Sequence, residues 1–282
     1  VDKVIHLFCL IAKIKPYINC NLVITATCGV KSFTNVTLTC SKLAFNKHMN
    51  ILCIAVQIQA VQIEVIKLAL RVIIQINAQG SNSIILYGGA NQAITEAQID
   101  QVLAQFDRGD YLLMQNEISL GEQILRKAHQ KGMHIILNPS PISPELLTWP
   151  FELVDWLILN EIEGTDLTGQ TEPESIVSAL IEERRVPHVV LTLGKKGAVY
   201  ASGAERIYQA AIPANVVDTT AAGDTFTGYF FASVLSGKSP AEALLRAAAA
   251  SSLAISQQGA AKSIPWASDV ILPDDVKQEV TK

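Results

Sequence analysis

Residues 218–226 (DTTAAGDTF) contain the residue types best suited to chemistry on a phosphate group. The small residues at 221–223 allow a backbone turn to approach a ligand closely. A helix predicted to start near Thr225 would direct its N–H groups and the positive end of its dipole into that turn, which suits an anion. Asp224 stands beside this predicted anion site, where a carboxylate can take the proton of a hydroxyl that attacks a phosphoryl group.

The same spacing allows a simpler role for Asp224. Aspartate just before a helix is most often an N-cap, whose side chain accepts a hydrogen bond from the first turn. The spacing alone leaves both interpretations open. The sequence contains no G-x-x-x-x-G-K-[ST] segment, so the predicted anion site is not that of a P-loop enzyme.

From residue 71 onwards, predicted strands alternate with predicted helices of about 10–15 residues, which is typical of a parallel sheet covered on both faces. The strands are expected at 71–77, 83–87, 110–115, 134–137, 156–159, 188–193, 197–201 and 206–211. The helices are expected at 95–106, 121–131, 161–167, 173–183, 225–235 and 240–256. Ligands of such sheets bind beyond the carboxyl ends of the strands. Candidate site residues stand just after predicted strands: Glu117, Asn138, Asn160, Thr192 and Asp218.

Composition excludes several classes of protein. The 282 residues are 49% hydrophobic and 17% charged, with a net charge of −4, which excludes a disordered chain. Mild acidity predicts no nucleic-acid partner. Charges interrupt the long apolar stretches, so no membrane span is expected. Five cysteines without a C-x-x-C pair indicate a reduced, cytoplasmic protein rather than a disulfide framework or a zinc site.

Residues 218–226 resemble the C-terminal signature of the ribokinase-like (PfkB) carbohydrate kinase family. Five further blocks occur in the family's order, at residues 112–117 (LLMQNE), 137–141 (LNPSP), 159–164 (LNEIEG), 191–197 (LTLGKKG) and 259–266 (GAAKSIPW). The resemblance covers about residues 71–270. It implies one α/β domain over residues 1–282. The fold would be a three-layer α/β/α sandwich with a mostly parallel central sheet and a small β lid. The hairpin at about 71–87 would belong to this lid.

The resemblance also implies an activity, the ATP-dependent transfer of the γ-phosphate to a primary hydroxyl of a pentose, in the first place ribose. Asp224 would be the catalytic base and would also contact the sugar. The anion hole for the γ-phosphate would consist of the backbone amides of Ala221, Ala222, Gly223 and Asp224. The alternatives are a kinase for fructose, 2-keto-3-deoxygluconate or adenosine, and a noncatalytic relative that binds a nucleotide or a sugar.

For ATP and Mg²⁺, the resemblance points to two further blocks. Asn160 and Glu163 match an N-x-x-E motif that organises Mg²⁺ and phosphate, with Glu163 acting through water; otherwise they would simply place polar groups at a helix N-terminus. Thr192, Gly194 and Gly197 match a loop that lies against the nucleotide, although an ordinary strand–turn–strand connection would also need the two glycines.

A monovalent-cation site, with K⁺ as the activator, is implied as well. Its side-chain ligands would be Asp218 and Ser263, the second of which could equally be an ordinary turn residue. Backbone carbonyls would complete the site at Thr220, Ala254, Gln257 and Gly259. Glu117 would contact sugar hydroxyls.

Residues 1–70 do not fit the family. They contain seven of the Lys and Arg residues, two of the Asp and Glu residues, all five cysteines and a single glycine, Gly29. Asn19 and Asn21 faintly resemble the family's first sugar-binding motif, with Asn21 in place of an aspartate that could accept hydrogen bonds as an anion. The GGAN stretch at 88–91 lacks the lysine of the second sugar motif and is expected to be a turn and helix start.

Two accounts of this segment remain open. In the first, the protein is an active kinase and a reading-frame or sequencing error affects the printed N-terminal residues. In the second, the segment is real and the sugar site has been lost. A homodimer through the lid is a further expectation, because an exposed β edge favours pairing.

Overall fold

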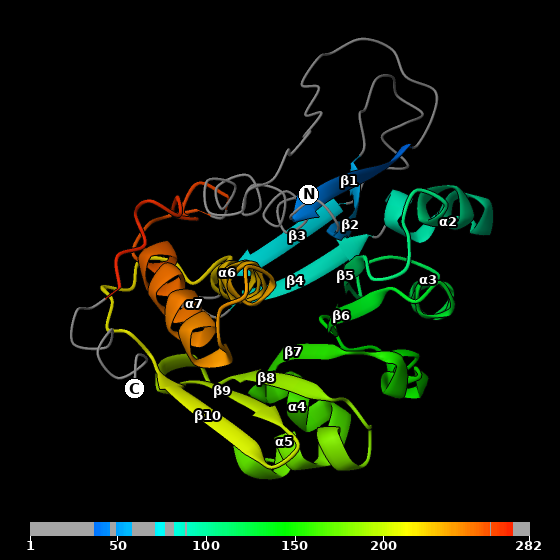
Figure 1. The fold of residues 1–282 in the computed structure, drawn as a ribbon. Helices are drawn as coiled ribbons and strands as arrows, with labels where there is room; N and C mark the ends of the chain where they lie inside the picture. Colours follow the sequence, from blue (N-terminus) through cyan, green and yellow to red (C-terminus); the bar gives the residue numbers. More distant parts are fainter. Residues whose placement is uncertain are drawn as a thin grey trace.

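The computed structural model describes residues 37–45, 49–57, 71–76, 82–87, 89–259 and 261–272. An eight-stranded sheet forms its centre, in the order β1-β2-β5-β6-β7-β8-β9-β10 (Figure 1). The strands are β1 (Thr37–Phe45), β2 (Met49–Gln57), β5 (Tyr111–Gln115), β6 (His134–Asn138), β7 (Trp156–Asn160), β8 (His188–Thr192), β9 (Gly197–Ser202) and β10 (Glu205–Ala210). The strands from β2 to β8 pair in parallel, whereas β1, β9 and β10 are antiparallel to their neighbours.

The parallel strands are apolar on both faces, because helices cover the sheet on both sides. The helices are α2 (Glu96–Leu103), α3 (Gly121–Gln130), α4 (Glu161–Thr168), α5 (Pro173–Glu182), α6 (Ala222–Leu235) and α7 (Pro240–Ile255). One buried cluster joins α2, α3, α4 and α5 to side chains such as Leu112 and Val189. A second joins α6 and α7 to the alternate side chains Leu113, Ile136, Ile158 and Val190. Figure 1 shows α6 and α7 on the opposite side of the sheet from α2 and α3. The predicted three-layer sandwich is confirmed.

A separate two-stranded sheet, here called the hairpin β3–β4, consists of β3 (Arg71–Ile76) and β4 (Asn82–Tyr87). The strands are antiparallel and pair Val72 with Leu86 and Ile74 with Ile84. The hairpin predicted at 71–87 is therefore confirmed, while its turn lies outside the described residues. Three residues of the GGAN stretch lie in a short 3₁₀ helix, η3 (Gly89–Gln92), which agrees with the expected helix start. The remaining 3₁₀ helices are η4 (Leu146–Thr148), η5 (Phe151–Leu153) and η6 (Gly194–Lys196).

Local capping explains where the helices begin. Thr95 caps α2, and Ser239 caps α7 with Pro240 in its first turn. Both caps are capping boxes, in which the cap side chain accepts from the third helical N–H and the third side chain accepts from the cap N–H. The two starts agree with the predicted helices, whereas α2 ends at Leu103 and not at residue 106 as predicted. Capping signals of this kind are local, because all their residues lie within four positions of the helix start.

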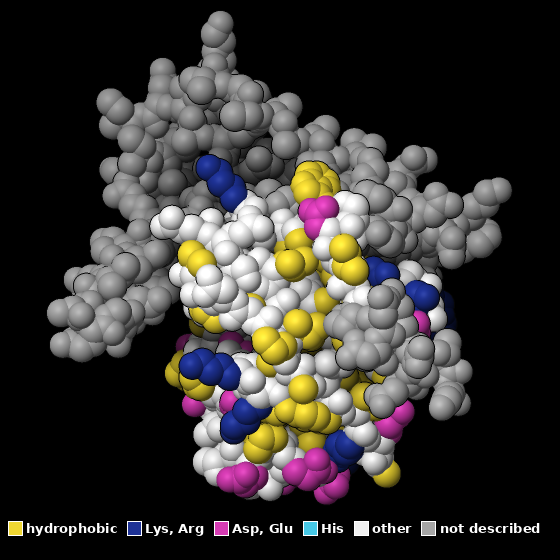
Figure 2. Space-filling model, turned by 90° about the vertical axis from the view of Figure 1, so that its left-hand side faces the viewer, with side chains coloured by type: hydrophobic (Ala, Val, Ile, Leu, Met, Phe, Trp, Pro, Cys, Tyr) yellow, Lys and Arg dark blue, Asp and Glu magenta, His cyan; other side chains and the backbone are white. Residues whose placement is uncertain are grey.

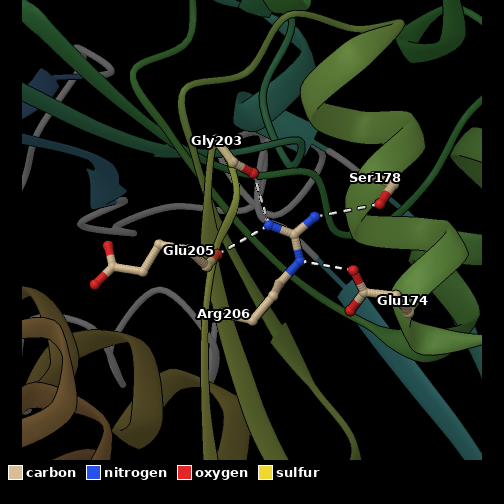
Figure 3. Close-up of polar contacts among 5 residues, drawn as sticks. All are labelled: Glu174, Ser178, Gly203, Glu205 and Arg206. Carbon is tan, nitrogen blue, oxygen red and sulfur yellow. Dashed lines mark hydrogen bonds and ion pairs between the residues drawn. The ribbon is translucent and has the colours of Figure 1, made fainter.

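Arg206 fastens the edge of the sheet to α5 (Figure 3). From β10, its guanidinium donates to Glu174 Oε1 at 2.9 Å and to Ser178 Oγ at 3.2 Å, both on α5. The same group donates to the carbonyl oxygens of Gly203 at 2.7 Å, in the turn after β9, and of Glu205 at 2.9 Å, the first residue of β10. Only a planar, forked donor can satisfy four acceptors in this arrangement. The antiparallel end of the sheet is thus held against the helical layer.

Figure 2 views the molecule from the side of α7. Hydrophobic side chains lie in the middle of this face, and Lys and Arg side chains are mixed with Asp and Glu towards its lower end (Figure 2). The charges seen here therefore alternate in sign and do not form a field of one sign. In the described part of the chain, no helix has both the length and the apolar character needed to cross a membrane.

Candidate active site

The carboxyl ends of the parallel strands carry a row of polar side chains. Each of the strands from β5 to β8 ends on one of them, and they are Gln115, Asn138, Asn160 and Thr192. Gln115 is paired with Asn138 and Asn160 with Thr192 in the sheet register. The residues two positions earlier belong to the cluster beneath α6 and α7, and side chains alternate between faces. The whole row therefore lies on the α6 side, as expected for a ligand site at this edge.

Helix α6 begins three residues earlier than predicted. Its N-cap is Ala221, with φ 63° and ψ 10°, and the first helical residue is Ala222 rather than a residue near Thr225. Asp224 consequently lies in the first turn of the helix, so the interpretation of Asp224 as an N-cap is wrong. The left-handed conformation of Ala221 costs about 1–2 kcal/mol for a residue with a Cβ, and the sequence, although it predicted a turn here, did not indicate this conformation.

The N–H groups of this first turn are the proposed anion hole. The geometry of an α-helix leaves its first N–H groups without partners inside the helix. The N–H of Ala222 donates to the carbonyl of Thr219 at 3.2 Å, and that of Thr225 donates to the carbonyl of Ala221 at 2.9 Å. The N–H of Ala222 is thus already engaged within the turn. Gly223 is exposed at the start of the helix, so its backbone is accessible to a ligand.

The carboxylate of Asp224 contacts one of the polar side chains at the strand ends, that of Gln115. The Nε2 atom of Gln115 lies 3.4 Å from Oδ1 of Asp224 and donates to it. This contact joins β5 to α6 across 109 positions of sequence. Gln115 was not among the predicted site residues, although its place at the end of a buried strand was available as a signal.

Hydrogen bonds of Asp218 connect the loop that precedes α6 with the loop that follows α7. Its Oδ1 accepts from the Thr220 hydroxyl at 2.6 Å and the Thr220 N–H at 2.9 Å, and its Oδ2 accepts from the Gly259 N–H at 2.9 Å. Hydrogen bonds from the Thr220 hydroxyl, the Thr220 N–H and the Gly259 N–H lower the pKa of Asp218, so the side chain stays an anion near neutral pH. The N–H groups of Val217 and Asp218 both donate to the carbonyl of Ile255.

This junction suits a monovalent cation in charge and in donor type. An ionised carboxylate has about four acceptor positions, and three donors are accounted for at Asp218. Ser263 is 1% exposed, so its hydroxyl is a buried polar group near the end of the described chain. The carbonyl of Ala254, at the end of α7, accepts from the N–H groups of Ser256 and of Gln257, the latter at 3.3 Å. Hard oxygen donors of this kind are what an alkali cation requires.

Asn160 and Glu163 form the capping box of α4. Oδ1 of Asn160 accepts from the N–H of Glu163 at 2.9 Å, and Oε2 of Glu163 accepts from the N–H of Asn160 at 3.0 Å. Among the described residues, Oε1 of Glu163 has no hydrogen-bond partner. These contacts fit the simpler interpretation, in which Asn160 and Glu163 only place polar groups at a helix N-terminus. They also leave one carboxylate oxygen of Glu163 for the water shell of a Mg²⁺ ion.

The other predicted nucleotide residues lie between the last residue of β8 and the first residue of β9. The hydroxyl of Thr192 donates to the carbonyl of Leu159 at 3.3 Å. Gly194 has φ 54° and open space around its Cα, whereas a Cβ on Gly197 would lie 2.0 Å from the carbonyl oxygen of Gln209. Gly197 is therefore required by the pairing of β9 with β10, and Gly194 is the glycine of this loop that leaves space for a ligand.

The predicted sugar contacts are only partly described. Glu117 follows β5 at the same edge of the sheet and is half-buried. Its neighbour Asn116 is fixed, because its Nδ2 donates to the carbonyl of Pro141 at 2.7 Å and its N–H to the carbonyl of Ser140 at 3.1 Å. The loop after β6 therefore supports the segment that bears Glu117. Asn19 and Asn21 lie outside the described residues.

Comparison with known proteins defines the class. The model of the pfkB family of carbohydrate kinases matches residues 55–267. The chain therefore belongs to this family. The match starts earlier than the resemblance found in the sequence, which began at about residue 71, and it takes in the end of β2 and the hairpin β3–β4.

Several ribokinases are among the relatives of the chain. The chain is 37% identical over 202 residues to ribokinase from Haemophilus influenzae, covering 68% of this chain and 64% of that protein. It is 39% identical over 206 residues to ribokinase from Arabidopsis thaliana, covering 68% of this chain and 53% of that protein. The chain thus spans less than two thirds of the length of these relatives.

Solved structures of ribokinases are also similar to the chain. The structure of Arabidopsis thaliana ribokinase complexed with ribose and ATP superposes with a TM-score of 0.60 at 35% identity, covering 71% of this chain and 67% of that chain. Ribokinase from Cryptococcus neoformans var. grubii serotype A in complex with ADP superposes with a TM-score of 0.62 at 34% identity, covering 71% and 70%.

Proposed function

We propose that the protein is an ATP-dependent sugar kinase that phosphorylates a primary hydroxyl of a pentose, in the first place ribose, and that residues 1–282 form one domain. The observation that carries this proposal is the position of Asp224. Its carboxylate lies in the first turn of α6, beside helix N–H groups, and receives a hydrogen bond from the polar row at the strand ends. A base and an anion-binding helix end are the two parts that transfer of a phosphoryl group to an alcohol needs.

In the proposed step, Asp224 takes the proton of the sugar hydroxyl, whose oxygen forms a bond to the γ-phosphorus of ATP. The bond from the γ-phosphorus to the bridging oxygen breaks, and ADP leaves. The backbone N–H groups at the start of α6, in the first place that of Gly223, would stabilise the charge of the transferring group. Catalysis would then consist mainly of positioning and electrostatic stabilisation.

Residues near the strand ends would hold the nucleotide and its metal. Asn160 and Glu163 would hold Mg²⁺, with Glu163 acting through water, and the loop of Thr192, Gly194 and Gly197 would lie against ATP. Mg²⁺ when bound would neutralise charge on the phosphates. Support for ATP comes from two of the solved relatives, one of which contains ATP and the other ADP.

Ribose is the substrate we propose first, because several relatives are named ribokinases, one of them solved with ribose. A deoxyribokinase from Salmonella typhi is also similar, at 27% identity over 161 residues. A coupled assay of ADP release with ribose, 2-deoxyribose, fructose, 2-keto-3-deoxygluconate and adenosine would test the proposal. We expect the highest kcat/KM with ribose. Turnover with none of these acceptors would support a noncatalytic ligand-binding protein instead.

The identity of the N-terminal residues is tested separately. Peptide mass mapping of residues 1–70 distinguishes the two accounts of this segment. Masses that differ from the printed sequence would support an active kinase whose N-terminal residues are affected by an error. Masses that match it, together with no turnover, would support the loss of the sugar site.

A potassium effect is expected from the junction at Asp218. K⁺ should raise kcat severalfold over Na⁺, because a larger cation fitted to Asp218, Ser263 and the nearby carbonyls of Thr220, Ala254, Gln257 and Gly259 would stiffen the turn before α6. Since the pKa of Asp218 is lowered, the carboxylate stays charged and the K⁺ preference should persist as the pH falls from 8 to about 5. Kinetics in KCl and NaCl at matched ionic strength would check this. Equal rates in both salts would refute the cation site.

Assembly and location are further parts of the proposal. The hairpin β3–β4 forms its own sheet among the described residues, and its strand edges could pair with those of a second copy. We propose a homodimer through this lid and a reduced, cytoplasmic location, as the cysteine content predicts. Sedimentation velocity at several protein concentrations would test the dimer.

A further inference from the structure

We propose that Gln115 is a positioning residue for the reaction, which holds the carboxylate of Asp224 in the orientation needed to accept the substrate's proton. The inference rests on the proposed function of Asp224 as the base. It starts from the 3.4 Å contact between Gln115 Nε2 and Asp224 Oδ1.

The contact joins a rigid element to a helix end. Gln115 is the last residue of β5, whose interior side chains Leu112 and Met114 are 0% and 1% exposed. Its backbone is paired with β6 at Asn138. The next residue, Asn116, is held by hydrogen bonds to the carbonyls of Ser140 and Pro141. The backbone that carries the Gln115 side chain is thus fixed on both sides, and a functional group is placed most accurately when the element that supports it is rigid.

The chemistry of the pair explains what the contact can do. The final torsion of an Asp side chain is broad, so an unsupported carboxylate rotates readily. A glutamine Nε2 carries two N–H donors and no charge, and an ionised carboxylate accepts only. A donor on Oδ1 therefore limits this rotation, and it does so without supplying an acid that would compete for the substrate's proton.

Three substitutions separate positioning from packing. Gln115→Met retains length and volume but removes the donor. Gln115→Glu retains the shape and replaces the donor with a second carboxylate opposite Asp224, so repulsion is added. Gln101→Met makes the same change as the first variant on an exposed residue of α2 and serves as the control. A role in packing alone would tolerate Glu better than Met, whereas a role in positioning predicts the reverse order.

The decisive measurement is a double-mutant cycle on kcat. We expect Gln115→Met to lower kcat about tenfold in the wild-type background, the order of magnitude for losing one hydrogen bond to a charged group. In the Asp224→Asn background the same change should leave the residual kcat unaltered, because the base through which Gln115 acts is gone. KM for ATP and the melting temperature should stay near wild type, and Gln115→Glu should lower kcat more than Gln115→Met.

Each outcome decides one question. An equal loss of kcat in both backgrounds would mean that Gln115 acts through the fold, and would overturn the inference. Unchanged kcat in Gln115→Met and Gln115→Glu would overturn it as well, while leaving the proposed function intact. Absence of turnover by the wild-type protein with every acceptor would overturn the proposed function itself, and the inference with it.

Discussion

Asp224→Asn is expected to lower kcat by roughly a hundredfold to ten-thousandfold, the range for loss of a positioned general base. Asparagine has the shape of aspartate but cannot take the proton of the sugar hydroxyl. ATP binding should change little, because the backbone N–H groups at the start of α6 remain in place. Steady-state kinetics with ribose and calorimetric titration of ATP would measure the two effects separately.

The control for this change is Asp166→Asn. Asp166 is exposed in the second turn of α4, and its side chain makes no hydrogen bond or ion pair with the other described residues. We expect its kcat to equal that of the wild type. Turnover that survives in Asp224→Asn would refute the assignment of the base, and loss of both turnover and ATP binding would show that the change had disrupted the helix end instead.

Gly197→Ala is expected to destabilise the protein by about 3 kcal/mol or more. The residue has φ 119°, and an added Cβ would lie 2.0 Å from the carbonyl oxygen of Gln209 and 2.8 Å from the backbone at Ala210. These obstacles are backbone atoms of the paired strand, so they cannot rotate away. The strands β9 and β10 would have to separate, and Arg206 would lose its alignment with α5.

Gly194→Ala provides the comparison, because it changes the same residue type three positions earlier. Gly194 has φ 54° and no atom within 4 Å of an added Cβ, so we expect a loss of only about 1–2 kcal/mol from backbone strain. Chemical denaturation of both variants would give the two free energies. Similar losses in both would contradict the steric argument for Gly197.

Much of the fold could be predicted because its signals are local. Buried strands such as residues 188–192 are short apolar runs, and the capping boxes at Thr95 and Ser239 mark helix starts within four residues. The polar residues Asn160 and Thr192 could be placed at one edge of the sheet because parallel strands end together. The alternation of predicted strands with predicted helices also predicted that helices cover both faces of the sheet.

The features that the sequence did not predict depend on backbone conformation or on contacts between distant segments. The start of α6 was misplaced because it depends on a left-handed Ala221, a conformation that the sequence DTTAAGD does not announce. Gln115 was missed because its partner is 109 residues away, and no periodicity reports such a pair. The capping box of Asn160 and Glu163 shows the converse, since one local pattern fits both a helix start and a metal-binding motif.

The order in which the layers of the sandwich are made has a consequence for synthesis on the ribosome. The side chains Leu113, Ile136, Ile158 and Val190 are covered by α6 and α7, and the last residue of α7, Ile255, follows Thr192 by 63 residues. Translation adds about 5–20 residues per second, so the face that α6 and α7 cover remains exposed for roughly 3–13 seconds after the strands have been synthesised. A nascent chain stalled before α7 would therefore present an apolar sheet face, which makes it a substrate for chaperones rather than a folded intermediate.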